Sequence, residues 1–329
     1  MINRIKSVVK RLPYAKPVFL KLSELENSNT ELRNSSSIMA QDIANLETDL
    51  KLHKTCVPPG HFYSPFPDIE HVRRNEKRIF ESTPLEIPGV KLNKKYQLKL
   101  FEEFTQYYTD MPFKAHKSKN LRYWFENEAY QYSDAICLYS MIRHLKPKKI
   151  IEVGSGYSSC AILDTNELFF NGAIDCVFIE PYPDLLFSLI KKADKKDITV
   201  IPKNIQDVDF AVFESLSSGD ILFIDSTHVS KIDSDVNYIF FEILPRLASG
   251  VHIHFHDVLY PFEYWPDIIY KGISWNEAYF VRAFLQYNNA FDIVFFNTYL
   301  EKLYPQKFKD KMPLCMKHMG GSIWIKKTR

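Results

Sequence analysis

Short apolar runs alternate with longer segments of helical periodicity from about residue 149 to the C-terminus. A short apolar run bounded by turn residues is typical of a strand that is buried on both faces of a parallel sheet. Because helical patterns separate these runs, we predict an α/β fold with a doubly wound, Rossmann-like sheet. The predicted strands cover residues 149–153, 176–180, 198–202, 220–225, 251–257, 291–296 and 321–326.

The first part of the chain has a different pattern. Between residues 22 and 52, apolar side chains recur at the alternating spacing of three and four that defines a coiled coil. This pattern predicts a long helix that either assembles a homo-oligomer or folds back on the rest of the chain. One series contains Leu25, Leu32, Met39 and Leu46, and the other contains Leu22, Asn29, Ser36, Ile43 and Leu50.

Residues 1–21 mix basic and apolar side chains. The apolar run is too short and too charged for a signal peptide or a membrane span. Two interpretations are open for this segment. It is either a helix that lies on the inner face of an anionic membrane or a solvated N-terminus.

Composition excludes several classes of protein. The formal net charge of +2 gives no overall field for binding nucleic acid, and a hydrophobic content of 46% is enough for a large core. The five cysteines are odd in number and none are spaced as metal ligands, so we expect reduced thiols in a cytoplasmic protein. We divide the chain into a basic, heptad-patterned segment (1–55), an N-terminal cap region (56–145) and a Rossmann-like domain (146–329).

A glycine-rich turn, Gly154-Ser155-Gly156, links the first predicted strand to a helical pattern. Glycine allows a sharp turn and a close approach of a ligand to the backbone, and the free N–H groups of a helix start favour an electron-rich ligand. The unit therefore predicts a nucleotide-type site at the carboxyl edge of the sheet. Glu152 precedes the turn and would repel a pyrophosphate, so it favours a ligand with a cationic end. Ser159 stands where a dinucleotide fold prefers a third glycine.

The sequence Glu-Val-Gly-Ser-Gly at 152–156 resembles motif I of the class I S-adenosylmethionine-dependent methyltransferases. From about residue 58 onward the chain is similar to bacterial members in which D-x-x-H follows the fourth strand and H-D ends the fifth, here 225–228 and 256–257. The resemblance implies a seven-stranded sheet that is closed by an antiparallel hairpin, with S-adenosylmethionine as the cofactor. It also implies cofactor contacts from Glu152, Gly154, Ser155, Gly156, Glu180, Pro181, Gln206, Asp207 and Asp225, with Glu180 on the ribose hydroxyls.

The catalytic groups are expected at the ends of the fourth and fifth strands. Asp225, His228, His256 and Asp257 bring carboxylates and imidazoles to this edge. Transfer to a hydroxyl needs an aligned acceptor and a base, and histidine titrates near neutral pH. The same residues, above all Asp225 and Asp257, could instead hold Mg²⁺. Both mechanisms stay open at this stage.

An aromatic segment follows the fifth strand and is the predicted lid over the acceptor. Aromatic faces and carboxylates suit a saccharide or another small polar acceptor, although such residues also close hydrophobic cores. Transfer to oxygen is the favoured reaction. Two other classes are open, an NAD(P)-binding oxidoreductase and a non-catalytic scaffold that is assembled through the N-terminal helix. The predicted acceptor-binding residues are Tyr260, Glu263, Tyr264, Trp275 and Glu277.

Overall fold

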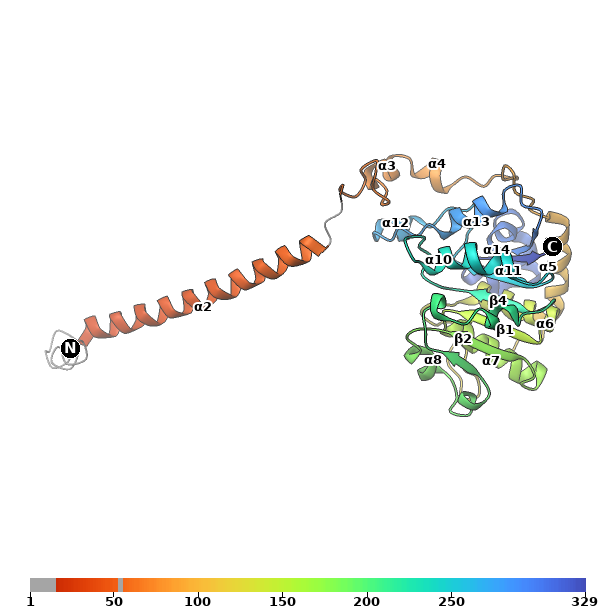
Figure 1. Ribbon diagram of the computed structural model, residues 1–329, viewed down its shortest axis with the longest axis horizontal. Helices are drawn as coiled ribbons and strands as arrows, with labels where there is room; N and C mark the ends of the chain where they lie inside the picture. Colours follow the sequence, from red (N-terminus) through yellow and green to blue (C-terminus); the bar gives the residue numbers. More distant parts are fainter. Residues whose placement is uncertain (1–15, 53–55) are drawn as a thin grey trace. The chain divides into compact units, whose positions relative to one another are not determined.

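The computed structural model describes residues 16–52 and 56–329, and the chain divides into two compact units, 1–64 and 65–329 (Figure 1). The boundary that the sequence suggested between residues 145 and 146 falls inside the second unit. The reason is that helices before residue 146 share one hydrophobic core with the sheet after it. Most of the basic segment 1–21, and with it the suggested membrane contact, lies outside the described residues.

Within the first unit, α2 (Lys16–Leu52) is a helix of 37 residues that contains the predicted heptads. The helical part of that prediction is therefore confirmed. The sequence Pro58-Pro59-Gly60 follows soon after, where proline and glycine do not continue a helix. Among the described helices, none is both long enough and apolar enough to cross a bilayer.

The second unit is built on a seven-stranded sheet with the order β3-β2-β1-β4-β5-β7-β6. Strands β1 to β5 run parallel, and β7 is antiparallel to both β5 and β6. The predicted fold class and its closing hairpin are confirmed. The strands are β1 (Lys149–Val153), β2 (Asp175–Ile179), β3 (Thr199–Ile201), β4 (Ile221–Ile224), β5 (His252–His256), β6 (Phe291–Phe296) and β7 (Ser322–Lys327).

Helices flank this sheet (Figure 1). On one side, α5, α6 and α7 pack next to one another, and most of α6 is buried. Residues 235–246 form one continuous helical segment. In it, α10 and α11 flank a π-helical turn, Ile239–Ile243. The helices are α3 (Ile69–Arg74), α4 (Glu76–Phe80), α5 (Lys94–Tyr108), α6 (Tyr132–Leu145), α7 (Tyr157–Phe170), α8 (Asp184–Leu189), α9 (Ala211–Glu214), α10 (Asp235–Tyr238), α11 (Leu244–Arg246), α12 (Pro266–Tyr270), α13 (Glu277–Leu285), α14 (Asn297–Leu303) and α15 (Pro305–Lys311).

Strand register brings three distant segments to one edge. Val153 at the end of β1 pairs with Ile224 at the end of β4, and Ile224 pairs with Phe255 near the end of β5. Parallel strands place their carboxyl ends on the same side of a sheet. The residues that follow β1, β4 and β5 are therefore neighbours, although about a hundred positions separate the first from the last.

Alternation along β5 decides which of its histidines reach that edge. His254 stacks on Phe223, with ring centroids 3.9 Å apart, and also contacts Trp324. Phe255 faces the opposite side and stacks on Phe240 of the π-helical turn. His252, His254 and His256 therefore share one face, as expected from the period of two. Only His256 lies at the carboxyl end.

Candidate active site

A cavity of ≈ 380 Å³ opens at the carboxyl ends of β1, β2 and β4. This volume lies within the usual range of small-molecule sites, about 300–1,000 Å³. Five residues predicted to bind the cofactor line it, namely Gly154, Glu180, Pro181, Gln206 and Asp225. The lining also includes Tyr182, which was not predicted, and Asn204, Ile205, Ser226 and Thr227, which lie within two positions of predicted site residues.

The turn after β1 requires glycine at its first position. Gly154 has φ +82°, and a Cβ atom there would lie 1.8 Å from the backbone oxygen of Asp225. Left-handed backbone is strained for other residues, and no side chain fits at that distance. The turn after β1 and the end of β4 therefore touch through their backbones at the wall of the cavity.

Glu152 lies beneath this turn, outside the cavity lining. It is fully buried, and its two oxygens accept hydrogen bonds from Ser158 Oγ (2.5 Å) and Ser159 Oγ (2.6 Å). Burial raises the pKa of Glu152 to about 8, against the opposing effect of the two hydroxyls. Ser159 Oγ also accepts from the N–H of Gly156. In this structure the acid ties the end of β1 to the start of α7.

Glu180 follows β2 and lines the cavity. Its carboxylate accepts hydrogen bonds from the N–H of Ser155 (3.2 Å) and from the N–H of Tyr182 (2.9 Å). These bonds hold the loops after β1 and β2 together and fix the carboxylate at the cavity wall. Ser155 thus supports the wall without lining the cavity itself.

The loop after β3 supplies the opposite end of the cavity. Residues Ile205–Asp207 form one 3₁₀ turn, in which consecutive side chains point about 120° apart. Gln206 lines the cavity and donates to the backbone oxygen of Asp233 (2.7 Å), whereas Asp207 is exposed and lies outside the lining. The structure therefore brings Gln206 to the site and leaves Asp207 at the surface.

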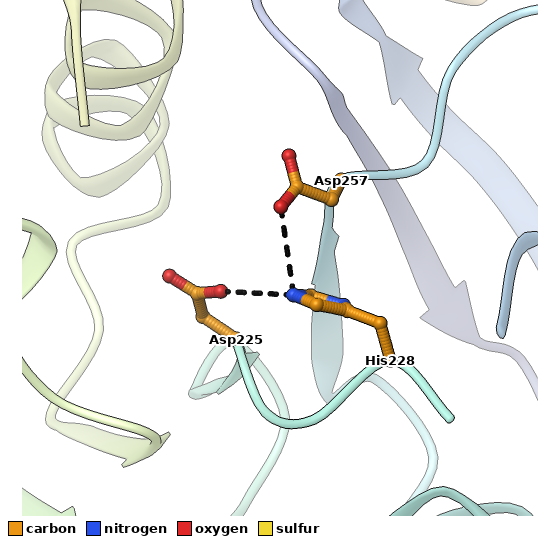
Figure 2. A group of neighbouring side chains, drawn as sticks. All are labelled: Asp225, His228 and Asp257. Carbon is orange, nitrogen blue, oxygen red and sulfur yellow. Dashed lines mark ion pairs between the residues drawn. The ribbon is translucent and has the colours of Figure 1, made fainter. Parts of the chain in front are cut away.

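Asp225, His228 and Asp257 converge at the adjoining edge, after β4 and β5. Figure 2 shows the three side chains pointing toward one another. His228 Nε2 lies 3.5 Å from Asp225 Oδ1 and 3.5 Å from Asp257 Oδ2. His228 and Asp257 both have positive φ, +60° and +53°. Left-handed backbone costs a non-glycine residue about 1–3 kcal/mol and is concentrated at functional sites.

Glu277 holds the other side of the His228 ring. Its carboxylate is buried and lies 2.8 Å from His228 Nδ1. Trp275 packs on the same imidazole, with ring centroids 4.5 Å apart. Burial alone would lower the pKa of His228, but Asp225 and Glu277 raise it well above its ordinary value. Glu277 and Trp275, predicted to touch the acceptor, both contact His228 in this structure.

The two aspartates of the cluster differ in electrostatics. Burial opposes the ionisation of Asp225, but His256 and His228 outweigh it and lower its pKa to about 2. Burial raises the pKa of Asp257, although the same two histidines oppose that shift. Asp225 therefore stays ionised more readily, and Asp257 is the carboxylate that more readily takes up a proton.

His256 stands behind Asp257. Its Nε2 atom lies 3.6 Å from Asp257 Oδ1, and its ring centroid is 5.1 Å from that of Tyr130. His256 Nδ1 has no hydrogen-bond partner within the described part of the chain. Burial lowers the pKa of His256, but Asp257 and Asp225 raise it above its ordinary value overall. His256 and Asp257 are both absent from the linings of the two cavities described at this edge.

A second cavity, of ≈ 160 Å³, lies under the aromatic segment that follows β5. Tyr260, Glu263 and Tyr264, three of the residues predicted to bind the acceptor, line it. Trp265 also lines it, and a Cβ at Gly321 would lie 3.1 Å from the Trp265 ring and 3.4 Å from Asp257 Oδ1. The indole and the carboxylate are therefore close neighbours. The remaining lining residues are Phe80, Leu259, Pro261, Pro266, Thr298, Lys302 and Met319.

Lys302 is the residue of this cavity that sequence patterns did not reveal. It lies on α14, more than forty positions after β5, and its Nζ donates to the backbone oxygen of Tyr260 (2.6 Å). Burial lowers the pKa of Lys302. No carboxylate in the described residues forms an ion pair with it. Glu263, in the same cavity, accepts from the hydroxyl of Tyr279 (2.5 Å) instead.

The donor set of the Asp225–His228–Asp257 cluster fits a divalent cation. One ligand atom from each residue can be chosen so that all lie within 4.8 Å of one another. Charge-assisted hydrogen bonds are about 2.7–2.9 Å long, so the two 3.5 Å separations at Nε2 are too long for strong bonds. Ligand atoms at about 2.1 Å from a shared cation are separated by about 3–3.5 Å. Metal-bound histidines usually donate their other N–H to a carboxylate, the position that Glu277 takes.

Comparisons with known proteins agree with this geometry. Residues 151–258 match the family model described as "Methyltransferase domain". An uncharacterised protein of Archaeoglobus fulgidus is 38% identical over 168 residues, which are 48% of this chain and 73% of that protein. The family-model match, residues 151–258, spans the strands and turns that surround both the cofactor cavity and the Asp225–His228–Asp257 cluster.

Solved structures give weaker similarities. A Podospora anserina methyltransferase bound to S-adenosylhomocysteine has 16% identity and a TM-score of 0.40, over 84% of this chain and 100% of that one. The O-methyltransferase TomG of Streptomyces achromogenes, in complex with S-adenosylmethionine, has 14% identity and a TM-score of 0.37. The match covers 73% of this chain and 92% of that one.

The matched family, the strand order and the glycine-cradled cavity after β1 define one class of enzyme. The chain belongs to the class I S-adenosylmethionine-dependent methyltransferases. Its cofactor is S-adenosylmethionine, and the cavity with Gly154, Glu180 and Asp225 on its walls fits that ligand. The NAD(P)-dependent and non-catalytic alternatives do not agree with this assignment.

Proposed function

We propose that this enzyme transfers the methyl group to a hydroxyl oxygen of a small polar acceptor, and that Asp225, His228 and Asp257 hold a divalent cation where the acceptor binds. One observation carries the proposal. Two carboxylates and one imidazole converge beside the cofactor cavity, which Asp225 lines, at separations too long for strong hydrogen bonds.

Each residue of the cluster has a part in this proposal. Asp225 lines the cofactor cavity and belongs to the cluster, so it joins the two sites. Glu277 fixes the His228 ring so that Nε2 faces both aspartates. When bound, S-adenosylmethionine supplies an electrophilic methyl carbon, and a divalent cation supplies charge that lowers the pKa of a hydroxyl. These residues thus orient the acceptor oxygen toward the cofactor cavity.

The proton that leaves the hydroxyl needs a base at the same edge. Asp257 has one oxygen toward His228 and the other toward His256. We assign the proton to the Asp257–His256 pair, in which the carboxylate lies between the two imidazoles.

The aromatic cavity supports a saccharide or a similar polyhydroxylated acceptor. Trp265 offers an aromatic face, Glu263 a carboxylate that accepts from hydroxyl groups, and Lys302 an ammonium that donates to them. Of these side chains, Trp265 lies close to Asp257. A small acceptor matches a cavity of this size better than a macromolecule does.

The first test is calorimetric titration of the purified protein with S-adenosylmethionine, S-adenosylhomocysteine and, as a control, NADH. We expect both adenosyl ligands to bind and NADH not to bind. The second test follows radiolabelled methyl transfer to a panel of monosaccharides, with Mg²⁺, with Mn²⁺ or after chelation. Turnover that survives chelation in protein free of metal would remove the cation from the proposal and leave the His256 base. A panel without any methylated saccharide would overturn the acceptor class.

A further inference from the structure

Helix α2 presents a long apolar stripe to solvent. Its apolar seam residues are between 49% and 67% exposed. A helix of 37 residues is about 55 Å long, and helices in proteins owe most of their stability to the packing of an apolar face. The stripe therefore needs a partner that covers its whole length. Its described members are Val18, Leu22, Leu25, Leu32, Met39, Ile43 and Leu46.

Two polar residues interrupt this stripe at defined positions. With Leu22 at heptad position a, the d positions are Val18, Leu25, Leu32, Met39 and Leu46, all apolar. The described a positions after Leu22 are Asn29, Ser36 and Ile43. A buried polar side chain costs stability unless it finds a hydrogen-bonding partner. The partner must therefore place polar groups opposite Asn29 and Ser36.

We propose that the partner is a second copy of this chain, bound through α2 as a parallel, in-register, two-stranded coiled coil. In that arrangement a positions face a positions, so Asn29 meets Asn29 and Ser36 meets Ser36 of the other copy. An antiparallel pair would place both against d positions, which are all apolar here. The β-branched Ile43 at position a with Leu46 at d favours two strands, and a polar asparagine at position a specifies register and oligomer state.

Flanking charges agree with a parallel pair near the start of the helix. In parallel coils, position g of one helix faces position e of the next heptad of the other. Lys21 at g then faces Glu26 at e, which is an attractive pair. Asp42 and Glu47 also face one another and repel, so the later part of the coil is held by the apolar layers of Ile43 and Leu46.

Cys56 gives a native reporter of orientation. It is exposed, whereas the other four cysteines are buried. It lies four residues after Leu52, so a chain of at most about 14 Å links it to the end of α2. A parallel pair brings the two Cys56 residues within reach of each other. In an antiparallel pair the two Cys56 residues stay at least about 27 Å apart, because two links of about 14 Å each cannot span a helix of about 55 Å. A disulfide needs Cα atoms within about 7 Å, so an antiparallel pair cannot form it.

The experiment uses the full chain in reducing buffer and then with diamide, which takes up the two electrons and two protons released as two thiols form a disulfide. Sedimentation velocity over a concentration series should show a dimer. Diamide should then produce a covalent dimer on non-reducing gels, and Cys56→Ser should abolish it without changing the mass in reducing buffer.

Two matched variants test the seam. Leu32→Glu places a charge at a d position and should give a monomer without the cross-link, whereas Gln41→Glu, at outer position f, should remain dimeric. Methyl-donor binding serves as the folding control for both. A wild-type monomer or trimer, a dimer that persists in Leu32→Glu, or a dimer that Cys56 does not cross-link would each overturn the proposal. None of these results depends on which acceptor the enzyme uses.

Discussion

The ends of β1 and β2 differ from the ends of β4 and β5 in how completely their polar groups are bonded. Both oxygens of Glu152 and of Glu180 accept hydrogen bonds from the chain itself. Beyond β4 and β5, His228 Nε2 has only long contacts, and His256 Nδ1 and Glu277 Oε1 lack hydrogen-bond partners among the described residues. The carboxylates of the first region are fully bonded before a ligand arrives, whereas the charged groups of the second are not.

This difference separates binding from chemistry. Groups that are already fixed cost little reorganisation when a cofactor binds, which favours affinity. Buried groups without partners are costly unless a ligand completes them, and they are then positioned for charge that develops in the reaction. Changes after β1 and β2 should therefore alter cofactor affinity or stability, and changes after β4 and β5 should alter turnover.

The largest effect is expected for Asp257→Asn. Asp257 lies outside the cofactor cavity, so affinity for S-adenosylhomocysteine should stay within a few-fold of wild type. Loss of one carboxylate from the cluster should lower kcat on the order of 10²–10³-fold. Steady-state kinetics and calorimetry measure the two quantities. The exposed Asp197→Asn serves as the charge-matched control, and a normal kcat in Asp257→Asn would contradict the catalytic assignment.

Gly154→Ala should instead weaken binding of the cofactor. The added methyl group meets the backbone oxygen of Asp225, so the turn must shift and the cofactor wall with it. We expect affinity for S-adenosylhomocysteine to fall on the order of 100-fold, equivalent to about 2.7 kcal/mol. Gly172→Ala is the matched control, because Gly172 has a similar φ of +73° with nothing within 4 Å of an added Cβ. Equal losses in both variants would mean that backbone strain, not the collision, is responsible.

Sequence patterns predicted the framework of both regions. Apolar runs located every strand, and spacing placed Gly154, Asp225, His228 and Asp257 at one edge, because the carboxyl ends of parallel strands must meet there. The heptads also predicted the long helix. These features depend on local periodicity and chain direction, which a sequence contains.

Side-chain direction was beyond the sequence. Glu277 and Trp275 lie in an aromatic run and were assigned to the acceptor, and the sequence did not show that their helix and loop place them against His228. Asp207 was assigned to the cofactor, but one step of a 3₁₀ turn points it to solvent. Lys302 reaches its cavity from a helix that no local motif links to the site. Such placements follow from tertiary packing.

Glu277→Gln should sharpen the comparison within the second region. Glutamine keeps the size of the side chain but removes the negative charge that orients His228. Loss of such an outer partner typically weakens metal binding about 10–100-fold. Titration with Mn²⁺, followed by calorimetry, measures the change. Glu263→Gln is the control, since Glu263 lines the aromatic cavity without contacting His228. If both variants lose Mn²⁺ affinity equally, the cause is a general loss of negative charge.

The smallest effect is expected for Glu152→Gln, and it concerns the pH dependence of stability. The pKa of Glu152 is raised from an ordinary 4.5 to about 8, mainly by burial. Between those pH values the folded protein binds more protons at this carboxyl than the unfolded chain does, so the free energy of unfolding decreases as the pH rises. Stability from the protonated carboxyl is complete below pH 4.5 and is lost as the pH approaches 8.

Glutamine cannot ionise, so Glu152→Gln should lose less stability than wild type across this window. Urea unfolding at several pH values measures the difference, which compares two proteins that share every other titrating group. Parallel curves would show that Glu152 is already ionised in the folded state. Calorimetry in buffers of different ionisation enthalpy then separates the two roles of this acid. If wild type releases a proton on binding S-adenosylmethionine and the variant does not, the cationic end of the cofactor lies near Glu152. If both proteins release protons equally, Glu152 is only the group that ties β1 to α7.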